Sequence, residues 1–327
     1  MSPSPRKALM RVIILGSTGF LGRSIVTHLA AAGHEVVGVS RSGRPSPEAP
    51  NTSAVALDLT SAAPRDLDDL LDGADAVIHG LGPDDRERVP APALDYFRRM
   101  QVAPTVAVAA AARRARVGTM VILGSYFSHF DRLRPELNLA GAHPYIQARR
   151  EQTAEARAAG PEVVTTLEIP FVFGAVPGVV PMWKSYLVDP LRRMPVGFVP
   201  RGMSAAVTDR DVAQAVSFAL EGRISGSMPI ATDNYSFHRL ARVMLGALGH
   251  PRRPVVGVPN AALALGMRAE AARLRLKKMD SGLDLARLPR DLIGADLSLD
   301  TTEFGEAIGL SPRTIDDAVI ATVRASQ

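Results

Sequence analysis

Near its N-terminus the chain reads RVIILGSTGFLG over residues 11–22. Residues 11–15 are mainly apolar and have the length of a strand, and residues 20–32 carry apolar side chains at helical spacing. Gly16, Gly19 and Gly22 occupy the turn between them. Glycine permits a tight turn and a close approach of the backbone to a pyrophosphate, while a helix N-terminus offers unpaired N–H groups. The stretch therefore predicts a dinucleotide-binding strand–turn–helix; the alternative is a glycine-rich turn without a ligand.

Outward from this turn, apolar runs of strand length alternate with longer helical patterns as far as Pro170. We expect further strands at 35–39, 55–57, 74–79, 119–123 and 163–169, and helices at 66–71, 104–116 and 145–159. Apolar strands joined by helices predict a parallel sheet that is covered on both faces. The predicted fold class is α/β, a Rossmann-type doubly wound parallel sheet with a smaller C-terminal substrate-binding part.

The pattern changes after Pro170. The following stretch is rich in Gly and Pro, an amphipathic helix is expected at 211–220, and helices between Gly/Pro turns follow from about residue 231, with only 255–258 strand-like. We predict a disordered tail at 1–9, a nucleotide-binding domain at 10–170 to which 204–230 return, and a substrate-binding part formed by 171–203 and 231–327.

Composition excludes several classes of protein. The 327 residues are 46% hydrophobic and 22% charged, as in ordinary globular proteins. Without cysteine there is no disulfide, cysteine-ligated zinc or thiol nucleophile, and the histidines form no metal-binding motif. The net charge of +5 is scattered, which argues against a nucleic-acid partner. No apolar run approaches a membrane span and no signal peptide is recognisable, so we expect a cytoplasmic protein with a small-molecule substrate.

The end of the second predicted strand bears on the choice of cofactor. A site for NAD usually has an acidic residue there, which binds the ribose 2′-hydroxyl. This chain has Ser40 and Arg41, with Arg44 close by. A guanidinium pairs with a 2′-phosphate through a forked, charge-assisted contact. We therefore predict NADP rather than NAD, the alternative being that Arg41 is a solvated loop residue.

The glycine turn and several later motifs resemble the extended short-chain dehydrogenases/reductases, the NAD(P)-dependent epimerase/dehydratase group, from about residue 10 to 320. The carrying motifs are GSTGFLG at 16–22, Asp58, VIHG at 77–80, QVAPT at 101–105 with Gln101 where the family has Asn, IPFVFG at 169–174, and the stretches 207–213 and 297–313. The resemblance implies cofactor contacts from Gly16, Ser17, Thr18, Gly19, Phe20, Leu21, Gly22, Ser40, Arg41, Asp58, Leu59, His79, Gly80, Leu81, Pro170 and Val172. Homodimers are common in that family.

The resemblance also implies the catalytic group. The family has a Tyr-x-x-x-Lys pair on a helix, and this chain has Tyr145 and Arg149 at that spacing, which places both on one helix face. A nearby cation is expected to lower the high pKa of a phenol, but arginine cannot give up a proton as lysine can. Tyr235 and Arg239 repeat the spacing in the C-terminal part and are the alternative pair.

Ser125 is expected to steady the substrate oxygen, with Ser128 as a rival if the alignment slips by a few residues. In the implied reaction Tyr145 donates a proton to that oxygen while Arg149 holds the cofactor ribose. The family's dehydratases have an Asp-Glu pair after the catalytic Ser/Thr, whereas Tyr126 and Phe127 follow Ser125 here. We expect an NADP(H)-dependent oxidoreductase that moves a hydride between nicotinamide and a carbonyl or secondary alcohol. The alternatives are a non-catalytic NADP(H)-binding sensor or interaction protein and, third, a sugar-nucleotide epimerase.

The substrate pocket is expected in the C-terminal part, where Met182, Trp183, Tyr186, Leu187 and Phe198 stand at the positions of the family's pocket wall. They suggest an apolar or ring-shaped substrate, although an aromatic cluster is more often plain packing. Nearby cations are either phosphate- or carboxylate-binding groups or a solvated surface; they are Lys184, Arg192, Arg193 and Arg201.

Overall fold

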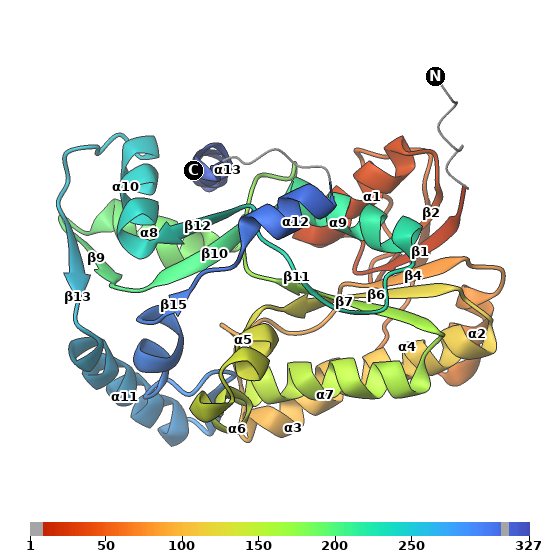
Figure 1. Ribbon diagram of the computed structural model, residues 1–327, viewed down its shortest axis with the longest axis horizontal. Helices are drawn as coiled ribbons and strands as arrows, with labels where there is room; N and C mark the ends of the chain where they lie inside the picture. Colours follow the sequence, from red (N-terminus) through yellow and green to blue (C-terminus); the bar gives the residue numbers. More distant parts are fainter. Residues whose placement is uncertain (1–8, 309–313) are drawn as a thin grey trace.

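A seven-stranded sheet in the order β11-β7-β6-β4-β1-β2-β3 dominates the computed structural model, which describes residues 9–308 and 314–327 (Figure 1). Its strands are β1 (Arg11–Leu15), β2 (Glu35–Ser40), β3 (Ser53–Ala56), β4 (Ala76–His79), β6 (Thr119–Ser125), β7 (Val163–Ile169) and β11 (Gly226–Pro229). Every neighbouring pair is parallel. The predicted Rossmann-type sheet is thereby confirmed.

Helices cover both faces of this sheet, because the central strands are mainly apolar and point apolar side chains to both sides. One face packs against α1 (Phe20–Ala31), α9 (Asp209–Gly222) and α12 (Thr301–Ala307). The other face packs against α2 (Pro64–Leu71), α4 (Ala103–Arg114) and α7 (Pro144–Ala159). Figure 1 shows the two helical layers above and below the strands. The short helix α3 (Ala93–Phe97) runs into α4 through a π-helical turn at Arg98–Val102.

The remaining elements form a smaller part, drawn at the left of Figure 1. β10 (Met203–Thr208) pairs with β8 (Phe171–Phe173), β12 (Asp233–Ser236) and β15 (Asp296–Leu297). Two further pairs are β9 (Gly197–Pro200) with β13 (Val255–Val258) and β5 (Arg88–Pro90) with β14 (Met279–Ser281). The helices are α5 (Phe127–Leu133), α6 (Leu139–Ala142), α8 (Asp189–Arg193), α10 (Phe237–Ala247), α11 (Asn260–Leu276) and α13 (Asp316–Ala325).

Two features of this part differ from the sequence prediction. The expectation that only 255–258 is strand-like beyond residue 231 is wrong, because β12, β14 and β15 are also strands. These strands are short and pair with segments far away in the chain, so no local apolar pattern marks them. Within the predicted return segment 204–230, β10 joins the small sheet, whereas α9 and β11 join the main sheet.

The predicted tail is described only at Leu9, since residues 1–8 lie outside the described residues, as does the end of the stretch 297–313. Over the part of the chain that is described, no helix combines the length and the apolar character needed to cross a bilayer. The same residues contain no cluster of His, Asp and Glu suited to a metal ion.

Candidate active site

The glycine turn lies where β1 ends, next to the end of β4. Gly16 has a positive φ of 91°, and a Cβ there would come within 2.9 Å of the Gly80 carbonyl oxygen. A Cβ on Gly22 would collide with the Gly16 carbonyl, whereas one on Gly19 would meet only that oxygen, at 3.3 Å. Gly16 and Gly22 are therefore required by the turn itself, while the surface over Gly19 stays open.

Helix α1 begins at this turn without a side-chain cap and without an acidic residue in its first turn. Its first N–H groups and the positive end of its dipole are therefore free to bind an anion. Gly16, Gly19 and the residues 20–22 line a cavity of about 700 Å³. An open cradle at a helix N-terminus fits the diphosphate of a dinucleotide.

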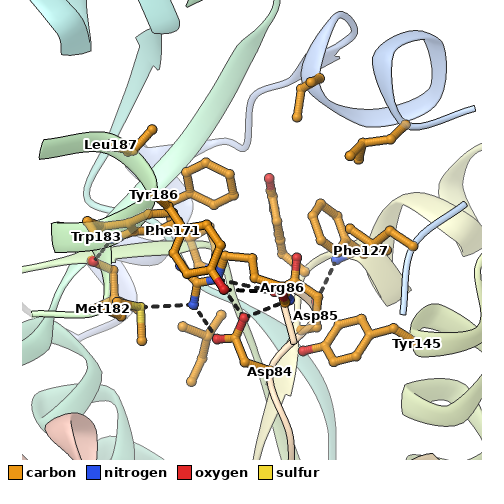
Figure 2. A pocket seen from close by; sticks show the side chains of 18 of the residues that line it. Asp84, Asp85, Arg86, Phe127, Tyr145, Phe171, Met182, Trp183, Tyr186 and Leu187 are labelled. Carbon is orange, nitrogen blue, oxygen red and sulfur yellow. Dashed lines mark hydrogen bonds and ion pairs between the residues drawn. The ribbon is translucent and has the colours of Figure 1, made fainter. Parts of the chain in front are cut away.

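The cavity runs from the turn, past the carboxyl ends of the central strands, to the smaller part of the molecule. The loop after β4, the end of β6 and the N-terminal half of α7 form one side. Apolar residues of the smaller part form the other side; they include Phe171, Met182, Trp183, Leu187, Leu191, Phe198, Phe237 and Met244. Figure 2 shows Phe127 and Tyr145 across the cavity from Met182, Trp183, Tyr186 and Leu187.

Tyr145 and Arg149 are brought together on the face of α7 that lines the cavity. The Arg149 Nε donates a hydrogen bond to the Tyr145 hydroxyl oxygen at 3.0 Å. The Arg149 Nη1 donates to the Leu123 carbonyl oxygen at 3.1 Å and to Gln152 Oε1 at 3.0 Å. The alternative pair does not form, because Arg239 binds Asp233 and Asp316 instead of Tyr235.

A buried chain of polar side chains continues from Arg149 into the protein. Gln152 accepts from Gln101 Nε2 at 3.3 Å and donates to Thr105 Oγ1 at 2.8 Å. Thr105 Oγ1 also lies 3.3 Å from His79 Nε2. Sequence reasoning singled out Gln101 and His79 but missed Gln152. Gln152 follows Arg149 by three residues and therefore lies on the same face of α7, so this spacing could have identified Gln152 as a partner of Arg149.

The pKa of Tyr145 is raised above its ordinary value of 10.0. Burial raises it most, Arg149 acts in the expected lowering direction, and the charges of Asp85 and Asp84 raise it further. Arg149 thus lowers the pKa as expected, but burial outweighs it. A phenol in this environment keeps its proton near neutral pH, so Tyr145 is suited to donate one.

Two carboxylates and an arginine that sequence reasoning missed also line the cavity. Asp84, Asp85 and Arg86 follow Gly82-Pro83 in the loop after β4. The Arg86 Nε donates to Asp84 Oδ1 at 2.5 Å, and the guanidinium carbon lies 4.3 Å from the centre of the Trp183 ring. Burial and the neighbouring Asp84 raise the pKa of Asp85 to about 7. The sequence does carry a signal for these residues. It is a pair of acids shortly after β4, whose carboxyl end lies next to the glycine turn.

Ser125 and Ser128 are placed differently. Ser125 ends β6, lines the cavity, and accepts a hydrogen bond from the Phe127 N–H at 3.4 Å. Ser128 lies one residue into α5, is buried, and is outside the cavity lining. Of the two serines, only Ser125 lines the cavity together with Tyr145.

Residues 16–165 match the family model described as NAD(P)H-binding. This stretch makes up just under half of the chain and is similar to NAD(P)H-binding domains. Over 77 residues the chain is 35% identical to 3-beta-hydroxysteroid dehydrogenase of Mycolicibacterium neoaurum, a match covering 24% of this chain and 20% of that protein. Over 81 residues it is 40% identical to dTDP-6-deoxy-L-talose 4-dehydrogenase (NAD(P)(+)) of Kitasatospora kifunensis, covering 24% and 25%.

Several solved structures are similar to this one over nearly the whole chain. Gox2253 aligns with a TM-score of 0.72 at 17% identity, over 96% of each chain. Bordetella bronchiseptica WbmG in complex with NAD and UDP aligns with 0.69 at 17% identity, over 97% of this chain and 95% of the other. UDP-N-acetylglucosamine 4-epimerase of Bacillus cereus aligns with 0.64 at 13% identity, over 97% and 99%. The chain shares the fold of these solved structures.

The other predicted site residues fall into two groups, those that line the cavity and those that do not. Gly80, Leu81, Pro170 and Val172 line the cavity with the glycine turn, as do Trp183 and Tyr186. Predicted cofactor contacts outside the lining are Ser17, Thr18, Ser40, Arg41, Asp58, Leu59 and His79. His79 is buried in the polar chain described above. Arg41 is exposed, and its charge lowers the pKa of Asp58, though less than the hydrogen bonds from Thr60 do.

The four cations predicted near the pocket do not line it. Lys184 and Arg192 lie near Asp189, with nitrogen–oxygen distances of 3.5 and 3.7 Å. The Arg201 Nε donates to the Gly257 carbonyl oxygen at 3.0 Å, and Arg193 is exposed. Their absence from the lining favours the alternative of a solvated surface.

Proposed function

We propose that this protein is an NADP(H)-dependent oxidoreductase that transfers a hydride between nicotinamide and a carbonyl or secondary alcohol of an apolar small molecule. The observation that carries the proposal is the Tyr145–Arg149 pair, which lines the same cavity as the glycine turn. The cofactor supplies or accepts the hydride when bound. The chain supplies the proton, the orientation of the substrate and the exclusion of water.

Tyr145 is the proposed proton donor to the carbonyl oxygen. Its raised pKa keeps the phenol protonated at neutral pH, which suits the reducing direction. Arg149 orients the hydroxyl and stabilises the phenolate that forms when the proton leaves. Ser125, at the end of β6 in the same cavity, is proposed to steady the substrate oxygen.

The cavity wall supports a neutral, apolar, ring-bearing substrate. Phe171, Trp183 and Phe237 contribute aromatic surface at the end opposite α7. The two arginines of the loop after β4 that line the cavity already have partners: Arg86 pairs with Asp84, and the Arg88 guanidinium lies 3.1 Å from Glu270. A sugar nucleotide carries a negatively charged diphosphate. Because Arg86 and Arg88 are already paired with carboxylates, the substrate end of the cavity offers little positive charge to bind that diphosphate. This argues against a sugar-nucleotide epimerase, although structural neighbours include such enzymes.

The proposed preference for NADP rests on Ser40, Arg41 and Arg44. Both arginines are exposed beyond the end of β2. Neither forms a salt bridge within residues 9–308 and 314–327, so each is available to a 2′-phosphate.

The test is turnover of NADPH with a panel of apolar ketones, comparing wild type with Tyr145→Phe. We expect oxidation of NADPH that falls by about 100-fold or more in the variant, while binding of NADPH is retained. Tyr235→Phe is the matched control, because Tyr235 is buried outside the cavity and should keep turnover at the wild-type level.

The second candidate, an NADP(H)-binding sensor, is favoured by the loss of a proton-labile lysine at Arg149. It predicts tight NADPH binding with no turnover of any ketone or aldehyde. Equal activity in wild type and Tyr145→Phe would contradict the oxidoreductase mechanism. It would not contradict the binding of NADPH.

A further inference from the structure

The loop after β4 brings two carboxyl groups side by side into the cavity. The side chains of Asp84 and Asp85 are 34% and 21% exposed, and both residues line the cavity. When Asp85 is protonated its carboxyl is within hydrogen-bonding reach of the Asp84 carboxylate. The pair can therefore share one proton at a position open to the substrate space.

Arg86 distinguishes the two acids. It binds Asp84 through Nε and Nη2, whereas the nearest Asp85 oxygen lies 3.9 Å from Nε. The guanidinium is fixed above Trp183 and Tyr186, 4.3 and 5.4 Å from the ring centres. Although burial opposes it, this contact lowers the pKa of Asp84, so Asp84 carries the negative charge. Asp85 is left as the acid that holds the proton.

Tyr145 needs such a group. Once its proton has moved to a substrate oxygen, the phenolate is bonded to Arg149, and a guanidinium does not give up its proton. Tyr145 and Asp85 interact electrostatically, and Figure 2 shows the Tyr145 hydroxyl pointing toward the loop that carries Asp84 and Asp85. The other ionisable groups around Asp85 are Asp84, Arg86 and Tyr126, and burial raises the pKa of Tyr126 far above neutrality.

We propose that Asp85 holds the proton that restores Tyr145 after each carbonyl reduction, delivered through water in the cavity. The inference rests on the proposed function. The O–H bond of the carboxylic acid breaks and the O–H bond of the phenol forms, with no change in oxidation state. The remaining Asp85 carboxylate then takes a proton from solvent. Asp85 acts through Tyr145 and not on the substrate itself.

The ionisation of Asp85 agrees with this role. Burial and Asp84 raise its pKa to about 7, although Arg86 acts in the opposite direction. The acid is then about half protonated at neutral pH, where transfer in both directions is easy. Above that pH the carboxylate predominates, and reprotonation of Tyr145 slows.

The first experiment compares the pH dependence of kcat for ketone reduction in wild type, Asp85→Asn and Glu87→Gln. Wild type should lose rate as the pH rises through about 7. Asp85→Asn should lose this dependence and be slower by about tenfold or more at pH 6, with NADPH affinity unchanged. Glu87→Gln is the matched control, because Glu87 is an exposed acid of the same loop outside the cavity lining. Asp85→Glu should restore part of the pH-dependent rate.

The second experiment needs no turnover. Phenolate absorbance, taken as the difference from Tyr145→Phe, reports the ionisation of Tyr145 in the protein alone. Asp85→Asn should shift its midpoint to lower pH, because a neighbouring negative charge is removed.

An active Asp85→Asn variant with the wild-type pH profile, or an unshifted Tyr145 titration, overturns the role of Asp85 while the proposed function stands. A wild-type protein that binds NADPH but reduces no ketone overturns both.

Discussion

The Arg149 Nε donates a hydrogen bond across 3.0 Å to the hydroxyl oxygen of Tyr145, one helical turn earlier in α7. The other side of the guanidinium is held by the Leu123 carbonyl and by Gln152. Three hydrogen bonds, one of them to the phenol, thus hold a permanent cation next to Tyr145. The arrangement preserves the electrostatic contribution of a lysine at this position while removing its ability to release a proton.

Replacing this cation tests its role directly. Arg149→Met removes a charge-assisted hydrogen bond worth about 1.5–3 kcal/mol, so kcat for ketone reduction should fall by about 10- to 100-fold. The pKa of Tyr145 should rise further, because Arg149 lowers it in the native protein. Steady-state kinetics and the phenolate titration measure the two effects.

Arg150→Met is the control for that substitution. Arg150 is the next residue, but its Nη1 binds Asp131 and it does not line the cavity. Its kcat should stay at the wild-type level. A similar loss of kcat in both variants would point to a general disturbance of α7.

The glycine turn offers a pair of matched substitutions. In Gly22→Ala the new methyl group collides with the Gly16 carbonyl, so the free energy of unfolding should decrease by about 1–3 kcal/mol. In Gly19→Ala the methyl group meets only the Gly16 oxygen, at 3.3 Å, and projects toward the open cradle. Stability should be nearly unchanged there, while the Kd for NADPH rises about tenfold or more, a cost of about 1.4 kcal/mol.

Urea unfolding measures the loss of stability in Gly22→Ala, and calorimetry measures the loss of NADPH binding in Gly19→Ala. Unchanged NADPH binding by Gly19→Ala would argue against a diphosphate at this turn.

Arg41 should decide between the two dinucleotides. Loss of a charge-assisted contact with the 2′-phosphate should weaken NADPH binding in Arg41→Ala by about 10- to 100-fold, with little change for NADH. Arg113→Ala, an exposed arginine at the C-terminal end of α4, should change neither. Fluorescence titration with both cofactors measures the ratio. A wild-type preference for NADH would refute the assignment.

Acid should destabilise the protein through His79. Its burial, aided by the charge of Arg149, lowers its pKa from 6.5 to about 4. The unfolded chain therefore binds this proton near pH 6.5, whereas the folded protein resists it until about pH 4. The contribution of His79 to stability is complete above pH 6.5 and is lost as the pH falls, by up to about 3 kcal/mol.

Urea unfolding between pH 4 and 7 measures this slope. His79→Gln should flatten it, leaving the smaller contributions of His129 and His143, whose pKa values are also lowered mainly by burial. His250→Gln, at an exposed position, should keep the wild-type slope. An unchanged slope in His79→Gln would show that His79 is not buried as a neutral group.

Several parts of the molecule were predictable because their causes are local. The apolar run of β1, the three glycines and the amphipathic α1 lie within one short stretch, and a strand–turn–helix of this kind permits few other conformations. The spacing of Tyr145 and Arg149 places both on one face of α7 wherever the helix packs. Such local patterns predicted six strands of the main sheet, whereas β11 was not predicted because it is short and pairs with the edge strand β7. Spacing alone left two Tyr–Arg pairs, and the resemblance to a known family selected Tyr145 and Arg149.

Tertiary structure alone decided the surroundings of that pair. Gln152 holds Arg149 together with residues from α4, and Asp85 faces Tyr145 from a loop some sixty residues earlier in the chain. The strands β12, β14 and β15 exist only because distant segments pair with them. Burial and neighbouring charge set the ionisation of Tyr145, and neither is encoded in sequence spacing. Such properties depend on which groups folding brings within a few ångströms of one another, so they emerge only when the chain has closed around the cavity.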